Sequence, residues 1–366
     1  MDAKSKRFLH DLLATSTPSG YEEPGQAVVA KFLGDFADDT RVDVHGNLHA
    51  SRNANAPFRV MLCGHVDEIG LMIMHIDAKG FLYVAPVGGV HAPGLQCERV
   101  LVHTANGPVP GVIGAKPIHM MDAKERENSQ SKIHEYWVDI GAKNKREAEK
   151  RVALGDVATI AAPVTEMGGR LVARGMDDRI GVFVVAEAMK LLAKTDLAVA
   201  LHVVSTVQEE IGLRGARTSA FGIDPHIGIA VDVSFATDVP GANPKLVGEA
   251  KLGGGPILHR GAYSHNPAVH RLLQKAAKDA KIKTQMQPVA NLGAGTDGNA
   301  LQINRAGVAV GVVSIPNRYM HSPVEMVDLA DVDNAAKLLA RFVANLKGNE
   351  KLAPGVLPSA KAKPEG

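Results

Sequence analysis

The most constraining feature of this sequence is a change of pattern between residues 69 and 165. This stretch is rich in valine, isoleucine and glycine, and turn signals such as DAKG, ANGP and AKNK recur in it at short intervals. Such a pattern is typical of a small all-β barrel. On both sides of the stretch, strand-like and helix-like segments alternate, which predicts crossover units and a mixed or parallel sheet with helices on both faces. We therefore expect an α/β domain interrupted by an inserted β-barrel.

The domain boundaries are placed where the pattern changes. Residues 1–68 and 166–348 form the two parts of the α/β domain, residues 69–165 form the inserted barrel, and residues 349–366 form a disordered tail. The tail is rich in proline and lysine and has no aromatic residue, so it has little apolar surface with which to fold. The chain has 366 residues and 45% hydrophobic content, enough for one large domain or two ordinary ones.

Helices are predicted where apolar residues recur at helical spacing. Two are expected before residue 37, separated by TSTPSG, because proline and glycine interrupt the pattern there. Residues 41–50 and 58–67 read as strands. The further predicted helices lie in four segments: 144–153, 267–282, 297–307 and 331–347.

The overall charge restricts the partners. Forty-one basic and 39 acidic residues give a formal net charge of +2, so no global field favours nucleic acid or an anionic membrane. No apolar run approaches the roughly 20 residues that cross a bilayer. The N-terminal MDAKSKRFLHDLL is charged where a signal peptide is apolar, and the only cysteines are Cys63 and Cys97. We expect a cytoplasmic protein without a disulfide and with neither nucleic acid nor membrane as a partner.

Chemistry-bearing residues follow several predicted strands. In MLCGHVDEIG, His65 and Asp67 are two apart, and on a strand such side chains share a face. The carboxylate can then hold the imidazole by its second nitrogen. The alternative is a surface histidine beside a capping aspartate. In IPNRYMHSPVEMV, His321 lies in a proline-flanked loop, where a simply exposed histidine is the alternative.

The acidic residues of the next two segments lie at or near strand ends. Asp177 and Asp178 stand where ARGMDDRIG changes from strand to helix, and a helix cap requires only one of them. Asp232 lies inside the apolar segment GIAVDVSFA. A buried, unpaired aspartate costs on the order of several kcal/mol, so it needs a hydrogen-bond network or a cation. The alternative is that the strand ends before it.

STVQEEIG adds two adjacent acids, Glu209 and Glu210, after the apolar run LAVALHVV. Adjacent acids repel each other, and in a regular strand they would face opposite sides. The pair is therefore expected where the strand has become a loop. A positive charge between them would make the arrangement favourable.

All five groups stand at the ends of strands, where α/β sheets place their binding crevices. Nitrogen and oxygen ligands without thiolate suit zinc, cobalt or manganese, and two histidines with three carboxylates suffice for a pair of divalent ions. Two divalent ions carry four positive charges, whereas the carboxylates of Asp177, Asp232 and Glu210 carry three negative charges. One positive charge therefore remains on such a pair. This surplus lowers the pKa of a bridging water towards ~7. One glutamate of the EE pair binds an ion, and its neighbour takes the proton and passes it to a leaving amine.

Taken together, these segments resemble the M42 metallo-aminopeptidases, the deblocking, glutamyl or tetrahedral type. The similar blocks are GHVDEIGLMI, GMDDRIG, TVQEEIGLRGA, VDVS, GTDGNALQ, PNRYMHSPVEM and, in the insert, GVIGAKPIHMMDAKEREN. The resemblance runs from about residue 5 to 347. It implies a phosphorylase/hydrolase-like α/β catalytic domain, an inserted barrel for dimerisation, dimers that assemble into a tetrahedral dodecamer, and removal of N-terminal residues from short peptides.

The resemblance also implies a ligand set of two divalent ions, with zinc first and cobalt or manganese as alternatives. His65 and Asp232 correspond to the ligands of one ion, and Glu210 and His321 to those of the other. Asp177 corresponds to the bridging carboxylate.

The same resemblance implies roles for two acids that bind no metal. Glu209 corresponds to the general base, and Asp67 to the acid that orients His65. The choice of Asp177 over Asp178 as the bridge follows the family's first position, since the sequence offers both.

Two other functions are compatible with the same residues. One is a carboxypeptidase or N-acyl amino acid deacylase that uses the same metal pair, and the other is a non-catalytic oligomeric scaffold. A glycosidase is disfavoured because its two-carboxylate mechanism gives such a ligand set no role. Cys63 is expected to be a small buried hydrophobe. Asp297 and His265 are alternatives for substrate contacts, and Met120 and Met121 for an oligomer contact.

Overall fold

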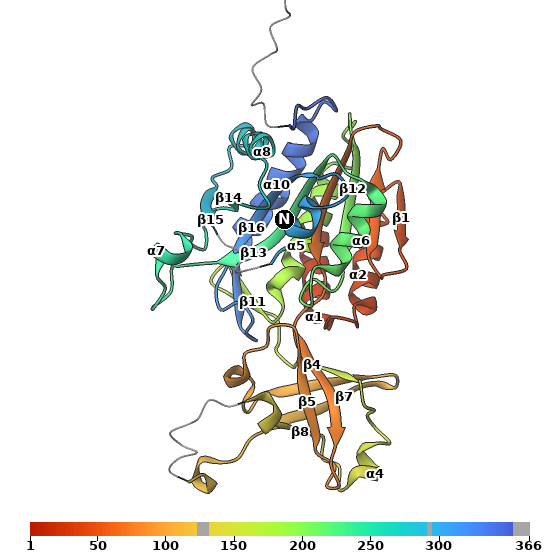
Figure 1. The fold of residues 1–366 in the computed structure, drawn as a ribbon, viewed down its shortest axis with the longest axis vertical. Helices are drawn as coiled ribbons and strands as arrows, with labels where there is room; N and C mark the ends of the chain where they lie inside the picture. Colours follow the sequence, from red (N-terminus) through yellow and green to blue (C-terminus); the bar gives the residue numbers. More distant parts are fainter. Residues whose placement is uncertain (123–131, 291–294, 354–366) are drawn as a thin grey trace, which may run out of the picture.

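The computed structural model describes residues 1–122, 132–290 and 295–353. The predicted tail lies outside the described residues from residue 354 onward. Figure 1 shows two bodies, an α/β domain and, below it, a barrel that the chain enters and leaves through neighbouring segments. No helix among the described residues is long and apolar enough to cross a membrane.

The α/β domain is built on an eight-stranded mixed sheet of order β1-β2-β12-β3-β13-β16-β14-β15. β12, β3, β13 and β16 are mutually parallel neighbours, while β1, β2 and the β14–β16 pair supply antiparallel contacts. The bounds are β1 Asp39–Val42, β2 Leu48–Arg52, β3 Arg59–His65, β12 Ala200–Thr206, β13 Ile227–Phe235, β14 Ile257–Gly261, β15 Gln285–Val289 and β16 Ala309–Asn317.

Helices cover both faces of this sheet, which is why its central strands are apolar on both sides. On β3, Val60 and Leu62 join the larger core, whereas Met61 and Cys63 join a smaller core on the opposite face. The larger core includes residues of α1 Ala3–Ala14, α2 Glu23–Leu33, α5 Met176–Leu191, α8 Pro267–Asp279 and α10 Leu329–Asn345. The smaller core includes residues of α6 Arg214–Ile223 and α9 Asp297–Gln302.

The inserted module is a closed six-stranded barrel of order β4-β5-β8-β7-β6-β9. All its strand pairs are antiparallel, and it has a hydrophobic core of its own. The bounds are β4 Gly70–Ile76, β5 Leu82–Val87, β6 Arg99–Thr104, β7 Gly107–Gly114, β8 Trp137–Asp139 and β9 Val157–Ile160. The predicted fold class, an α/β domain with an inserted small barrel, is confirmed. The strands lie within 69–165, the predicted limits of the insert.

Short elements complete the two bodies. A three-stranded sheet of order β10-β11-β17 lies beside the main sheet. The bounds are β10 Thr165–Met167, β11 Arg170–Ala173, β17 Glu325–Asp328, α4 Lys145–Ala148, α7 Pro244–Val247, and the 3₁₀ helices η1 Ala92–Leu95, η2 Ile118–Met120 and η3 Ile133–Glu135.

Three local predictions differ from the structure. The predicted strand at 41–50 is a hairpin, because Asp43 accepts hydrogen bonds from the backbone of His45 and Asn47 and so forms a turn. The predicted helix at 144–153 is reduced to the four residues of α4, and the one at 297–307 ends at Gln302. In each case the predicted element was too long, because the residue pattern continues beyond the turn at which the element ends.

Candidate metal centre

The topology gathers the predicted residues at one edge of the sheet. His65 is the last residue of β3, and it pairs with Thr206, the last residue of β12. Glu209 and Glu210 follow in the loop after β12, and Asp232 lies on β13. Because β3, β12 and β13 are parallel, their carboxyl ends meet at the same edge. The alternative in which the strand ends before Asp232 is wrong, since β13 continues to Phe235.

Asp177 and His321 reach this edge from two other segments. Asp177 stands at the start of α5, where the backbone of Asp177 and Asp178 is not yet helical. His321 lies in the connection between β16 and β17. Asp177 Oδ1 lies 3.1 Å from His65 Nε2, and Asp177 Oδ2 lies 3.4 Å from His321 Nε2. One carboxylate thus faces both imidazoles, one oxygen to each.

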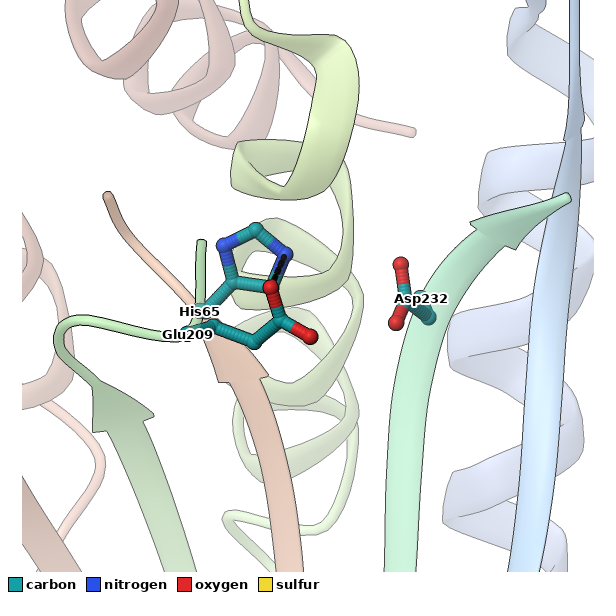
Figure 2. Close-up of side chains that lie close together, drawn as sticks. All are labelled: His65, Glu209 and Asp232. Carbon is teal, nitrogen blue, oxygen red and sulfur yellow. Dashed lines mark ion pairs between the residues drawn. The ribbon is translucent and has the colours of Figure 1, made fainter. Parts of the chain in front are cut away.

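The ligand atoms form two adjacent clusters. His65, Glu209 and Asp232 make one cluster, and Asp177, Glu210 and His321 make the other; within each, the atoms lie within 4.8 Å of one another. Figure 2 shows the first cluster, with His65 at the end of β3, Glu209 beside it and Asp232 opposite on β13. Glu209 Oε2 is 3.7 Å from His65 Nε2, and Glu210 Oε1 is 3.5 Å from His321 Nε2.

In the hydrogen bonds of the described residues, Asp178 is bound by backbone N–H groups and not by an imidazole nitrogen. Its carboxylate accepts hydrogen bonds from the backbone N–H of Gly181 at 2.9 Å and of His65 at 3.2 Å. The contact to Gly181, three residues on, is that of a helix N-cap. The close approach needs a glycine, since a Cβ at position 181 would lie 2.2 Å from Asp178 Oδ2. The helix cap is therefore Asp178, and Asp177 is the acid that faces the cluster.

Backbone carbonyls hold both histidines. His65 Nδ1 lies 3.0 Å from the carbonyl oxygen of Asp67, and His321 Nδ1 lies 2.9 Å from that of Gly89. A carbonyl oxygen only accepts, so Nδ1 carries a proton in each ring. Nε2 is then the nitrogen directed at Asp177, and it is the one available to a metal.

Asp67 contacts His65 through both its backbone and its side chain. The backbone carbonyl oxygen of Asp67 lies 3.0 Å from His65 Nδ1, and the carboxylate Oδ1 lies farther away, at 3.5 Å. Asp67 itself stands beyond the end of β3, which is at His65. The carboxylate also accepts from the backbone N–H groups of Glu209 at 3.0 Å and Glu210 at 3.2 Å, and from Ser19 Oγ at 2.7 Å. Asp67 therefore also holds the loop that carries the two adjacent glutamates.

Glu325 is a residue that sequence reasoning missed. Its side chain is 1% exposed. Oε2 accepts from the backbone N–H of Asp177 at 2.8 Å, and Oε1 accepts from that of His321 at 2.9 Å. The sequence shows that Glu325 is an acid between two apolar residues, four positions after His321. The neighbouring residues do not indicate which groups it binds.

The charges of the first cluster are unbalanced without a cation. Burial raises the pKa of Glu209 to about 10, an effect that His65 opposes and the neighbouring carboxylates increase. Burial and Asp177 raise the pKa of Asp232 well above its ordinary value. Burial alone would lower the pKa of His65, but the acids around it, Glu209 first, outweigh this and raise it well above its usual range. Burying this many carboxylates is costly unless positive charge lies among them.

The second cluster shows the same excess of acid. Contacts with Asp177 and Glu210 raise the pKa of His321 to about 11. Burial would raise the pKa of Asp177, but His321 and His65 outweigh it and hold that pKa below its ordinary value. Glu210 Oε1 is buried without a hydrogen-bond partner. Imidazole nitrogens and carboxylate oxygens without thiolate fit zinc, cobalt or manganese, so the residues present fit divalent ions.

The other predicted positions lie as follows. Cys63 is fully buried in the smaller core, as expected of a hydrophobe, and it and Cys97 are free cysteines. Asp297 is buried and accepts from Thr206 Oγ1 at 2.5 Å. His265 packs against His270 with ring centroids 5.1 Å apart. Met120 is 70% exposed.

This chain is similar to known proteins along most of its length. A model of the M42 glutamyl aminopeptidase family matches residues 46–338. A lysyl aminopeptidase of Pyrococcus furiosus is 39% identical over 90% of this chain and 94% of its own.

Two solved structures are similar along almost the whole chain. An aminopeptidase from Desulfurococcus kamchatkensis has a TM-score of 0.87 at 37% identity, covering 94% of this chain and 96% of its own. The TET1 peptidase of Pyrococcus horikoshii, which can assemble into a tetrahedron or a large octahedral shell, has a TM-score of 0.84 at 31% identity, covering 93% of this chain and 100% of its own. The chain belongs to the M42 family of glutamyl aminopeptidases.

Proposed function

We propose that this protein is a metal-dependent aminopeptidase that uses a pair of divalent ions to remove N-terminal residues from short peptides. The observation that carries the proposal is the placement of Asp177, whose two oxygens face His65 and His321 at 3.1 and 3.4 Å. A carboxylate so placed is suited to bridge two ions. Family membership supports the reaction, because the relatives matched are aminopeptidases.

In this proposal His65 and Asp232 hold one ion, Glu210 and His321 hold the other, and Asp177 bridges them. Zinc is the first choice and cobalt or manganese the alternatives, because imidazole and carboxylate suit all three. Two ions bound there would supply Lewis acidity, which polarises a peptide carbonyl and lowers the pKa of a water molecule.

Glu209 is proposed as the general base. Its carboxylate is nine-tenths buried within the first cluster, 3.7 Å from His65 Nε2 and within 4.8 Å of Asp232. Asp67 holds its backbone N–H, which limits the movement of the loop. From this position Glu209 takes a proton from the water molecule whose oxygen attacks the peptide carbonyl carbon, and holds that proton on a carboxylate oxygen. It gives the proton to the leaving amine nitrogen as the C–N bond breaks.

Self-association is part of the proposal. The TET1 peptidase of P. horikoshii, to which this chain is 31% identical, can assemble into a tetrahedron or a large octahedral shell. We propose that this chain forms dimers through its barrel and a tetrahedral dodecamer from them. The two free cysteines fit the further proposal that it works in the reducing cytoplasm.

Substitution of Glu209 by glutamine tests the general base. The amide keeps the size of the side chain but cannot take the proton, so we expect kcat to fall roughly 10²–10⁴-fold while metal content, measured by elemental analysis, stays at the wild-type level. Glu187, a buried acid bonded to Ser5 and Lys190, provides the control substitution to glutamine, with wild-type activity per folded molecule. Unchanged turnover in the Glu209→Gln variant would contradict the assigned role.

Three peptides separate the proposed reaction from its alternatives. The metal-loaded wild type is given a free peptide, its N-acetylated form and its C-terminal amide. An aminopeptidase cleaves the first and third and fails on the second. Cleavage of the acetylated form with failure on the amide indicates a carboxypeptidase. Release of acetate indicates a deacylase, and inertness toward all three favours a scaffold.

A further inference from the structure

The inserted barrel reaches into the candidate metal centre. Two glycines, Gly88 and Gly89, directly follow β5 and stand between the barrel and the α/β domain. The carbonyl oxygen of Gly89 lies 2.9 Å from His321 Nδ1, across 232 residues of sequence. The barrel thus supplies a hydrogen-bond acceptor to a residue of the second cluster.

Both glycines lie close to the second cluster, and at Gly89 the His321 ring leaves no room for a side chain. A Cβ at position 89 would lie 2.9 Å from both Cε1 and Nδ1 of the His321 ring. A Cβ at position 88 would lie 3.2 Å from Glu210 Cβ and 3.4 Å from its Oε2. The loop therefore packs on the two residues that, with Asp177, make up the second cluster, and a hydrogen bond is not its only contact.

The two histidines differ in where their acceptors come from. His65 donates to the carbonyl of Asp67, two residues further along the same segment. His321 has its acceptor on the inserted barrel. The ring orientation of His65 is therefore set within the α/β domain, whereas that of His321 depends on how the barrel sits against it.

We propose that the barrel is part of the metal centre, with Gly89 as a positioning residue that fixes the His321 ring so that Nε2 is its metal-binding nitrogen. This inference rests on the proposed ion pair and deepens it. It makes the second ion, held by Glu210 and His321, depend on the contact between the two bodies. The first ion, held by His65 and Asp232, is independent of that contact.

Gly89→Ala tests this dependence, and Gly94→Ala is its matched control. Gly89 has no positive φ, so alanine there acts only through the close contact with the His321 ring. Gly94 lies in the same connection, in η1, and a Cβ there would meet only His91 Nδ1, at 3.9 Å. Metal-free wild type and both variants are titrated with Zn²⁺ by calorimetry, and circular dichroism checks that each is folded.

We expect the wild type and Gly94→Ala to bind two ions per chain with the same affinities. Gly89→Ala should bind the first ion as the wild type does and the second roughly 10–100-fold more weakly. Wild-type affinities at both sites in folded Gly89→Ala would overturn the inference while leaving the proposed function standing. A wild type that binds fewer than two ions would overturn the proposed function, and this inference with it.

A second measurement uses only the wild type, so it tests the inference even if Gly89→Ala does not fold. In the zinc-loaded wild type, the imidazole ¹⁵N chemical shifts of His321 report which nitrogen carries the proton. The inference predicts a protonated Nδ1 and a metal-bound Nε2. The opposite assignment, with Nδ1 on the metal, would overturn it.

Discussion

At the scale of single residues, Glu325 shows how one side chain can set the position of two proposed ligands. It accepts the backbone N–H of Asp177 with one oxygen and that of His321 with the other. These two residues are 144 positions apart in the sequence (321 − 177), so this buried carboxylate joins segments that share no local structure. Such supporting contacts hold ligands at the separation that a metal requires.

Glu325→Gln is predicted to weaken metal binding. The new amide group turns N–H donors toward a backbone N–H, so one of the two contacts is lost. We expect affinity for Zn²⁺ to fall roughly 10–100-fold, measured by calorimetric titration of the metal-free protein.

Asp331→Asn is the matched control for Glu325→Gln. Asp331 is also 1% exposed and also accepts two backbone N–H groups, those of Gly253 and Gly255, both at 2.7 Å. Both variants should lose about 1–3 kcal/mol of stability, but only Glu325→Gln should lose metal affinity. Equal affinities in the two variants would show that Glu325 acts on folding alone.

At the scale of elements, a buried cation joins α1 to the start of α5. Arg179 is fully buried and donates to the carbonyls of Leu12 and Thr15, at the C-terminal end of α1, and to that of Gly175. It also contacts Glu68 at 3.2 Å. The arginine thus adds a donor to the carbonyls at the end of α1, where the regular hydrogen bonds of the helix stop.

Arg179→Met is predicted to destabilise the protein by about 3–5 kcal/mol, because the carbonyl of Thr15 loses a donor and the buried Glu68 keeps only Arg174 as a cationic partner among the described residues. Arg7 in the same region makes an exposed ion pair with Asp11, 3.7 Å away. Arg7→Met should therefore change stability by no more than about 1 kcal/mol. Urea unfolding of the metal-free proteins measures the stability of both variants. A similarly small loss of stability in the two would show that Arg179 does not stabilise the contact between α1 and α5.

The contact between β14 and β16 is predicted to be sensitive to pH. His259 Nε2 lies 2.8 Å from Ser314 Oγ, and burial lowers the pKa of His259 to about 4. The ordinary imidazole pKa in the unfolded chain is about 6.5. Between these values the unfolded chain binds more protons, so stability decreases as the pH falls from about 6.5 towards 4.

His259→Gln should remove this dependence. Between pH 7 and pH 5 the free energy of unfolding should decrease by about 1 kcal/mol more in the wild type than in the variant. This value allows for the partial exposure of the His259 ring. Urea unfolding of the two metal-free proteins at both pH values gives the difference. Identical pH dependence in the two would show that His259 does not contribute.

At the scale of the whole molecule, local patterns were sufficient to predict the architecture. Alternation of strands and helices, and its replacement by short strands after residue 69, predicted the α/β domain and its inserted barrel. Residue types at strand ends also indicated the predicted ligands, because parallel strands bring their carboxyl ends together. His65 and Asp232 lie where that argument places them.

What the sequence could not predict are the contacts made through the backbone. Glu325 acts on Asp177 from 148 residues away, and Gly89 on His321 from 232. Asp67 was expected to face an imidazole, and its carboxylate lies 3.5 Å from His65 Nδ1. The sequence did not predict that the same carboxylate also accepts the backbone N–H groups of Glu209 and Glu210. None of these contacts leaves a periodic signal, since any residue supplies a backbone N–H or carbonyl.

Anomalous diffraction from crystals of the zinc-loaded protein can show whether two ions share Asp177. We expect two zinc peaks per chain, roughly 3.5–4 Å apart. One should lie against His65 and Asp232, the other against Glu210 and His321, with Asp177 between them. A single peak, or none between the two imidazoles, would rule out the proposed pair of ions.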